Sequence, residues 1–303
     1  MRVKGKPTNA LPRAGRPGLA WAIPGVLFFL FFAIIPMALV GYLSFTEWDG
    51  LGAPTWNGGA NWSQLWNDST MRQAIGLSVL LTALTWLLQT PIALLLGVWA
   101  AGKQRNRAIL SAIFFLPLLA SSVALALIWR TLLNPNLGLA ADVARWFNLE
   151  SADVLGNPRG AFLAIVFVAA WQFVPFHTLL YQGGARQIPR SLYDAASIDG
   201  AGTVRQFFAI TLPQLRNTII TSSILMVVGA LTFFDTVLVL TGGGPGHATA
   251  IVPYYMYETG FQAFNLGYAS AIAATLVVVA TAVSLLLVRL TGFTKMRSTR
   301  EGM

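Results

Sequence analysis

Residues 189–213 read PRSLYDAASIDGAGTVRQFFAITLP and connect two long apolar stretches of the chain. Pro189 is well placed to open a helix, because proline is favoured at helix N-termini. Gly200 or Gly202 can adopt the left-handed conformation that ends a helix. The segment therefore predicts a short helix that ends in a glycine turn. Such a segment is structured and is not a flexible linker.

A second short helix is predicted directly after that turn. Thr203 with Gln206 three residues later is a capping-box signature. Ala195 and Ala196 give the first helix a smooth surface, and the apolar side chains of the pair are Leu192, Tyr193, Ile198 and Phe207. On these residues alone two interpretations are open: a helix pair that docks in a groove of another protein, or an amphipathic helix that lies among lipid headgroups.

The rest of the chain has the composition of a membrane protein. Of its 303 residues 55% are apolar and only 10% are charged, whereas soluble domains carry roughly 25% charged residues. Apolar runs long enough to cross a bilayer lie at 19–45, 74–100, 108–133, 160–183, 217–241 and 268–290. Because backbone polar groups in lipid must be satisfied within helices, we expect an all-α integral membrane protein with six transmembrane helices in one domain, residues 19–291. Prolines within these runs are expected to kink the helices rather than end them, namely Pro24, Pro36, Pro91, Pro117 and Pro175.

The distribution of positive charge predicts the orientation in the membrane. Lys and Arg number five in residues 1–18, three in 101–107, four in 184–216 and four from Arg289 onward, which makes sixteen, against four on the opposite side of the six runs. Because positive charge favours the cytoplasmic side, both termini are expected in the cytoplasm, with 1–18 and 292–303 as cytoplasmic tails. The net charge of +9 is then a topology signal, and no nucleic-acid partner is expected.

The spacing within residues 189–213 distinguishes between the two interpretations of the helix pair. Asp194-Ala195-Ala196, then Gly200, then Ile210 and Leu212-Pro213, closely resembles the EAA loop of ABC importer permeases, whose pattern is Glu-Ala-Ala, three residues, Gly, nine residues, Ile-x-Leu-Pro. The departure is Asp194 in place of Glu, which keeps the charge and shortens the side chain. The resemblance implies that residues 185–216 form a cytoplasmic coupling loop, which docks in a groove of an ATP-binding subunit.

A second stretch narrows the resemblance to carbohydrate importers. The motifs are Phe233-Phe234-Asp235-Thr236, Leu240-Thr241-Gly242-Gly243-Gly244-Pro245, Thr249 and Gly267-Tyr268-Ala269-Ser270-Ala271. They look like the fifth and sixth spans of permeases of the maltose-transporter type, and the similarity covers about residues 70–290. It implies a type I ABC importer permease fold in the cell membrane, a second permease that makes a heterodimer, two ATP-binding subunits, and an extracytoplasmic sugar-binding protein.

No cofactor and no catalytic residue are expected in this chain. Residues 97–104 fit the spacing of a phosphate-binding loop only up to Gln104, where magnesium binding needs a Ser or Thr hydroxyl. ATP and Mg²⁺ are therefore expected on the partner subunit. The chain contains no cysteine, and His177 and His247 lie far apart in sequence, so no metal site is expected.

Polar and aromatic residues within the spans are candidates for a sugar pathway, because polar groups facing lipid are costly. Gln89 ends a stripe formed with Ser78, Thr82 and Thr85 on one helix face, although such a stripe can also hold helices together. Trp171 and Gln172 in the fourth run can stack on and hydrogen-bond a sugar, and packing is the alternative for Trp171.

The fifth run adds Phe233 and Asp235 as pathway candidates. In a continuous helix from residue 217, eighteen residues at ~1.5 Å each put Asp235 about 27 Å along, near the outer interface. There it can either bond a sugar or cap the turn at 241–245. His177 is interpreted as a neutral helix-packing residue.

Two functions remain on sequence grounds. The first is the permease subunit of an ATP-driven sugar importer, which forms half of the pathway. The second is a self-sufficient secondary sugar carrier driven by an ion gradient, a class commonly built from internal repeats. The two halves of this chain show no such repeat, and Asp235 is the one acidic residue inside a run.

Overall fold

The computed structural model describes residues 19–102, 113–146 and 153–291 and is almost entirely helical. Four helices are long and apolar enough to cross a membrane: Ile23–Leu43, Ser69–Ala100, Pro158–Ala185 and Leu266–Arg289. The first contains α1 (Ile23–Phe29), a π-helical turn (Leu30–Ile34) and α2 (Ile35–Leu43); the others are α4 (Ser69–Ala100), α9 (Pro158–Ala185) and α16 (Leu266–Thr291). The expectation of a helical protein with several helices of membrane-spanning length is therefore confirmed.

Shorter elements connect and extend these helices. Before α4 come a 3-10 turn (Leu19–Ala22), β1 (Thr46–Glu47) paired antiparallel with β2 (Thr55–Trp56), and α3 (Ala60–Asn67). Between α4 and α9 lie α6 (Leu116–Leu119), α7 (Ser122–Leu132) and α8 (Leu139–Trp146). After α9 come α10 (Arg190–Ile198), α11 (Thr203–Gln206), a π-helical turn (Phe207–Thr211), α12 (Leu212–Gln214), α13 (Arg216–Leu231), α14 (Asp235–Leu240), α15 (Val252–Tyr257) and a second π-helical turn (Glu258–Gln262).

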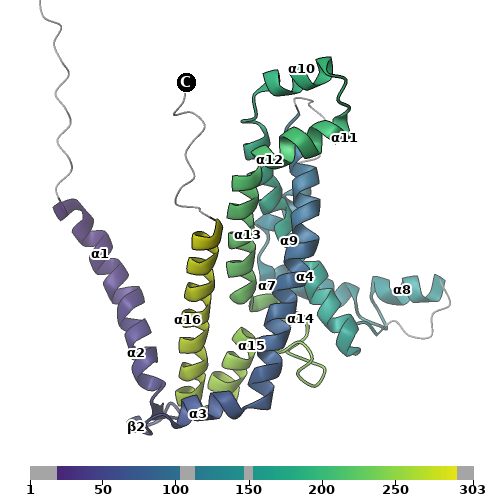
Figure 1. Cartoon of the computed structure of the whole chain (residues 1–303). Coiled ribbons are helices and arrows are strands. Elements are labelled where there is room, and N and C mark those ends of the chain that lie inside the picture. The colour runs from purple at the N-terminus through teal and green to yellow at the C-terminus, as the bar shows by residue number, and fades with distance from the viewer. Residues whose placement is uncertain (1–18, 103–112, 147–152, 292–303) are drawn as a thin grey trace, which may run out of the picture.

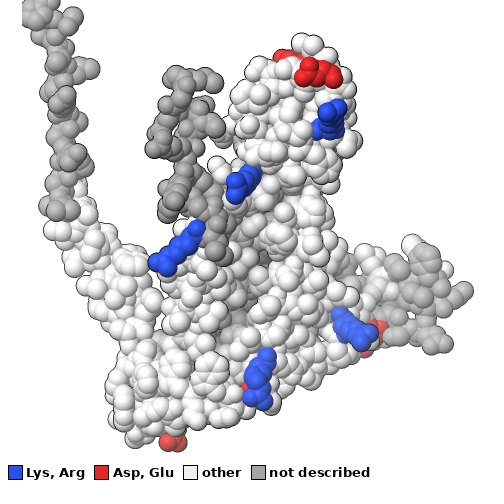
Figure 2. Space-filling view, viewed as in Figure 1, with Lys and Arg blue, Asp and Glu red and all other residues white. Residues whose placement is uncertain are grey.

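The two ends of the helical body differ. Figure 1 shows α10 and α11 at one end, beyond the ends of α4 and α9, while the β hairpin and α3 lie at the opposite end. On the visible face the few charged side chains lie in the upper part, toward α10 and α11, and in the lower part, toward the hairpin end and α8, and a band between the two groups is free of charge (Figure 2). An uncharged band of this kind is what a bilayer requires.

The first long helix stands apart from the others. Figure 1 shows α1 and α2 splayed away from the body, meeting it near the end that carries the hairpin. None of the spanning window of Ile23–Leu43 is buried, whereas 61% of the α9 window is buried. The helical core is therefore formed around α9.

Two of the six expected runs are not continuous helices. The run at 108–133 begins in residues 103–112, which lie outside the described residues, and its described part is broken between α6 and α7 at Ala120 and Ser121, both extended. Pro117 stands at the start of α6 rather than at a kink inside a longer helix, because proline lacks the N–H that a helix interior needs. Pro91 and Pro175 lie inside α4 and α9, and Pro36 lies inside the continuous Ile23–Leu43 helix directly after its π-helical turn, whereas Pro24 stands at the N-terminus of that helix.

The fifth run breaks as well. Its helix α13 ends at Leu231, where the Thr232 hydroxyl donates to the carbonyls of Val228 and Gly229 (3.2 and 3.3 Å), and α14 starts afresh at Asp235. The expectation of one helix from 217 to 241 is therefore wrong. At its other end α13 follows the 203–214 segment at a bend of 67°.

Helices α4 and α9 cross in close backbone contact. A Cβ on Gly97 would lie 2.6 Å from the Tyr181 Cβ and 2.8 Å from the Thr178 carbonyl oxygen. Next to this contact the Gln182 amide donates to the Ala100 carbonyl at the end of α4 (2.8 Å). Backbone contact and a helix-end hydrogen bond together fix how α9 lies on α4.

Asp68 ties three elements together at the hairpin end. Its carboxylate caps α4 by accepting from the backbone N–H groups of Thr70 and Met71 (2.8 and 3.2 Å). It also accepts from the hydroxyls of Tyr255 and Tyr268 (2.6 and 2.7 Å), which come from α15 and α16. Burial raises the pKa of the Asp68 carboxyl, but these four hydrogen bonds outweigh burial and hold the pKa below its ordinary value of 3.8.

We expect Gly97→Ala to destabilise the protein by about 1–3 kcal/mol, because the added methyl forces α4 and α9 apart. Gly76→Ala is the matched control on the same helix, since nothing lies within 4 Å of its Cβ position. The measurement is the thermal unfolding midpoint in detergent. Equal midpoints for the two variants would contradict the proposed contact.

We expect Asp68→Ala to lower the free energy of unfolding by about 2–3 kcal/mol, because a charged acceptor is lost. A lowered pKa adds stability that is fully present above the ordinary value of 3.8 and is lost as the pH falls through the folded-state value. Wild type should therefore lose more stability than Asp68→Ala between about pH 5 and pH 3. Tyr257→Phe, on the same helix as Tyr255, is the control, because its hydroxyl makes no hydrogen bond with the described residues. A pH dependence shared by wild type and Asp68→Ala would argue against this role.

Candidate substrate pathway and coupling surface

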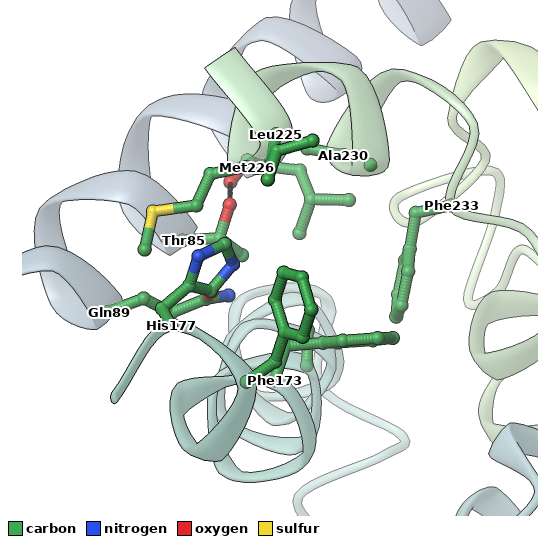
Figure 3. Close-up of a pocket in the computed structure, with 12 residues that line it drawn as sticks. Thr85, Gln89, Phe173, His177, Leu225, Met226, Ala230 and Phe233 are labelled. Carbon is green, nitrogen blue, oxygen red and sulfur yellow. Dashed lines mark hydrogen bonds between the residues drawn. The ribbon is translucent and has the colours of Figure 1, made fainter. Parts of the chain in front are cut away.

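A pocket of about 280 Å³ lies between α4, α9 and α13 (Figure 3). Each of the three helices contributes several residues, and Phe233, just after the end of α13, completes the lining. The full lining is Leu81, Thr85, Gln89, Ala169, Phe173, Phe176, His177, Leu225, Met226, Gly229, Ala230 and Phe233. This is a concave, mostly apolar site with a few polar groups, as is typical of small-molecule sites.

Three polar side chains face this pocket. The Thr85 hydroxyl donates its hydrogen to the Leu81 carbonyl one turn earlier (2.7 Å), so that it can only accept from a ligand. His177 Nδ1 shares a hydrogen bond with the Ser222 hydroxyl of α13 (2.9 Å). Gln89 is only 5% exposed, and its amide makes no hydrogen bond with the described residues. The Gln89 side chain lines the cavity and is not one of the polar groups sealed in the described structure without a partner. Its amide is therefore the group in this pocket that is most available to a ligand or water.

Aromatic rings form much of the remaining wall. Phe173 and Phe233 meet edge to face with ring centroids 6.4 Å apart. In Figure 3 Gln89 and His177 lie on one side of the view, Phe233 on the other, and Phe173 between them. The pocket therefore offers hydrogen-bonding groups opposite an aromatic surface.

Two of the five sequence-predicted pathway residues, Gln89 and Phe233, line this pocket. Trp171 faces elsewhere, with its ring packed edge to face on Trp129 (5.4 Å). Gln172 is buried and donates to the Ser122 hydroxyl of α7 (3.0 Å), while its carbonyl oxygen has no partner. Asp235 is exposed at the start of α14.

The polar stripe expected on the second span divides among several roles. Ser78 accepts from the backbone N–H of Val252 (3.0 Å), and Thr82 donates back to the Ser78 carbonyl (2.8 Å). The turn at 241–245 is held by Thr249 and Tyr254, which donate to the carbonyls of Gly244 and Gly242 (2.9 and 2.7 Å).

That His177 lines the pocket was not predicted from the sequence. The sequence feature that could have indicated this is its spacing: His177 follows Phe173 by four residues and so lies on the same face of the helix.

The 189–213 segment forms the predicted pair of helices. Pro189 precedes α10, which ends at Ile198 with a Schellman motif: the Gly200 N–H donates to the Ser197 carbonyl (3.1 Å), and the Ala201 N–H donates to the Ala196 carbonyl (2.8 Å). Gly200 has φ +77°, so it is the glycine that supplies the left-handed turn. Gly202, with φ −70°, does not.

The predicted capping box is not formed. Gly202 precedes α11, and no side chain caps it. Gln206 instead donates to the Ala201 carbonyl and to the Ser197 hydroxyl (2.8 and 3.0 Å), because the tight turn brings α10 within reach of its amide. Gln206 therefore links the two short helices rather than capping the second.

The motif residues of this segment divide between an outer and an inner face. Asp194, Ala195, Gly200 and Pro213 are exposed, whereas Ala196, Ile210 and Leu212 are half-buried. Tyr193, which anchors α10, shares a hydrogen bond with the Thr211 hydroxyl (2.8 Å), and Tyr193, Phe207, Ile210 and Leu212 pack on the end of the helical body. Large apolar side chains remain on the outer face, with Ile198 87% and Val204 71% exposed.

Comparisons with known proteins match most of this chain. Residues 93–293 match the family model described as binding-protein-dependent transport system inner membrane component. A probable ABC transporter permease of Bacillus subtilis is 32% identical over 86% of this chain and 91% of its own length. The multiple sugar-binding transport system permease of Streptococcus mutans is 31% identical over 88% of this chain and 92% of its own length.

Solved structures have the same fold. A chain in the crystal structure of a bacterial alginate ABC transporter, in complex with an alginate pentasaccharide-bound periplasmic protein, has a TM-score of 0.80 at 22% identity. The match covers 90% of this chain and 92% of that chain. The protein described here belongs to the family of binding-protein-dependent transport system inner membrane components and is a transport permease of the carbohydrate ABC importer type, not an enzyme.

Proposed function

We propose that this chain forms half of the translocation pathway of an ATP-driven sugar importer. It spans the cell membrane six times with both termini in the cytoplasm. Sixteen of the 20 Lys and Arg residues lie on one side of the six apolar runs, which supports this orientation. The four long helices and the bent pair of Thr203–Gln214 with Arg216–Leu231 account for five of the spans, and the broken 113–132 region belongs to the sixth.

The α10–α11 pair is the coupling surface for an ATP-binding subunit. The observation that carries this proposal is its construction: a helix with an EAA-like sequence, closed by a Schellman turn at Gly200 and braced inward by Tyr193. Its outer apolar side chains have no partner within the described chain, and they lie at the end of the body away from the hairpin (Figure 1). A rigid projecting helix with apolar anchors suits a protein groove.

The pocket between α4, α9 and α13 is the sugar-contacting part of the pathway in this subunit. Phe176, Leu225 and Gly229 at its rim are exposed, so the pocket opens at the surface of the chain. We place a second, different permease against this surface, and an extracytoplasmic sugar-binding protein at the hairpin end. The periplasmic protein in the solved alginate transporter supports this assembly.

The alternative is a secondary carrier driven by an ion gradient. Such a carrier needs groups that bind the coupling ion inside the membrane. Asp235 is exposed at the start of α14, and the described residues contain no cluster of three or more His, Asp or Glu side chains that could hold a metal ion. We therefore favour ATP as the energy source, with magnesium and nucleotide on the partner subunits.

Reconstitution distinguishes the two functions. Vesicles that hold the complete complex should import sugar only when ATP is inside and the binding protein outside. Vesicles that hold the purified chain alone should not import sugar under a proton or sodium gradient. Gradient-driven uptake by the chain alone would refute the importer-subunit function.

We expect Gly200→Val to abolish ATP-dependent uptake while the protein still inserts into the membrane. No atom lies within 4 Å of the Cβ position, so the defect comes from backbone strain at φ +77° and not from a clash. The measurements are uptake and retention of the ATP-binding subunit during purification.

Two controls accompany this variant. Gly200→Asn should retain most activity, because asparagine tolerates the left-handed conformation. Gly202→Val, two residues away at φ −70° with nothing within 4 Å of its Cβ, should have a much smaller effect. Full transport by Gly200→Val would remove the turn from the coupling mechanism.

A further inference from the structure

The pocket between α4, α9 and α13 is uncharged throughout its described lining. The solved relative works with a periplasmic protein that carries alginate, an acidic polysaccharide, so the shared fold leaves the charge of the cargo open. Resting on the proposed function, we infer that this pocket admits one ring of a neutral sugar, which Gln89 and His177 hydrogen-bond, and rejects uronic acids and sugar phosphates.

The cost of burying a charge carries the exclusion. An anionic sugar in this pocket would lie among aromatic, aliphatic and neutral polar side chains, with no Lys or Arg in the described lining to pair with it. A buried ion without a partner costs far more than a buried hydroxyl, and hydroxyls can be satisfied by single hydrogen bonds. The site therefore discriminates against carboxylate and phosphate groups.

Two groups can accept or donate to hydroxyls of the ring. The Gln89 amide provides both a donor and an acceptor and makes no hydrogen bond with the described residues. The Nδ1 atom of His177 is engaged by Ser222 (2.9 Å), so its Nε2 atom remains for a ligand. Gln89 and His177 come from α4 and α9, the two helices joined by the close crossing at Gly97, so their spacing is fixed by that contact.

The opposite wall suits the apolar face of a sugar ring. A pyranose presents C–H bonds on its faces and hydroxyls at its edge. Phe173 and Phe233 supply aromatic surface against which the C–H face can pack, while Gln89 and His177 meet the edge. Since a buried group built to hydrogen-bond a hydroxyl rejects ligands that leave it unpaired, these two residues determine specificity and do more than line the wall.

The size of the pocket limits what it holds. Its volume of about 280 Å³ is slightly below the roughly 300–1,000 Å³ that ligand pockets span. One sugar ring is therefore the natural occupant. Further rings of an oligosaccharide extend through the open rim at Phe176 and Leu225.

Saturation-transfer NMR on the purified complex, without its binding protein, tests this inference apart from transport. The probes are neutral sugars and charged counterparts altered at the same exocyclic carbon, where the hydroxymethyl group is oxidised to a carboxylate or carries a phosphate: glucose with glucuronate and with glucose 6-phosphate, and galactose with galacturonate. We expect transfer to at least one neutral sugar, and at least tenfold weaker transfer to its charged counterparts. Equal or stronger transfer to a charged member, or transfer to no neutral sugar, would overturn the inference.

Substitutions of Gln89 and His177 test whether these two residues bind the neutral sugar. Gln89→Leu and His177→Phe should each weaken binding of the neutral sugar about five- to tenfold, the expected loss for one neutral hydrogen bond. Thr275→Val removes a hydroxyl that bonds its own helix, α16, outside the pocket (Thr275 to the Ala271 carbonyl, 2.9 Å), and should leave binding unchanged. Gln89→Asn, which keeps the amide, should retain more affinity than Gln89→Leu.

Two outcomes separate this inference from the proposed function. If Gln89→Leu and Thr275→Val bind the neutral sugar equally well while ATP-dependent import persists, the inference fails and the importer function stands. If the complete complex imports no sugar with ATP, the proposed function fails whatever the NMR result.

Discussion

The close crossing of α4 and α9 is the contact on which the other functional features depend. Gly97 lets the two backbones meet near Tyr181 and Thr178, and Gln182 closes the end of α4 through the Ala100 carbonyl. Lipid supplies no hydrophobic force between helices, so such contacts rely on small residues and interhelical hydrogen bonds. The pocket begins two turns away from Gly97 at Gln89. One packing contact thus fixes both the pocket wall and the direction in which α9 leaves the membrane.

That direction matters because α9 continues into the 189–213 segment, the proposed coupling surface. Only five residues separate its last turn, at Gln182, from Ile188, which is buried on the same core cluster as Leu215. Tyr193 and Phe207 then fasten α10 and the following turn to this cluster. The chain bends by 67° before α13, which carries Met226 and Ala230 of the pocket. A displacement of α10–α11 would therefore be transmitted to two of the three helices that enclose the pocket.

The sequence could predict the long helices but not their breaks. Runs of about 20 apolar residues must be helical in lipid, and α4, α9 and α16 follow their expected runs closely. The breaks at Ala120 and Thr232 have no proline or glycine at the break itself. At Thr232, where α13 ends, the side-chain hydroxyl donates to carbonyls one turn earlier. Thr85 makes the same kind of bond in the middle of α4, and the helix continues past it. Whether a helix bends, ends or continues unchanged at such a bond depends on tertiary packing.

The two buried glutamines show why the site could be predicted only in part. Both Gln89 and Gln172 lie within apolar runs, so the sequence predicts the same role for both, namely contact with the transported sugar. In the folded chain Gln172 is tied to Ser122 across to α7, and its carbonyl oxygen is sealed from solvent without a partner. Gln89 instead borders a cavity shared with His177 and two phenylalanines. A sealed amide can contact a ligand only after a helix moves, whereas an amide at a cavity wall can form hydrogen bonds with a ligand or water in the cavity. The difference comes from how three helices pack together, and it is why the proposed sugar contact lies at Gln89 and not at Gln172.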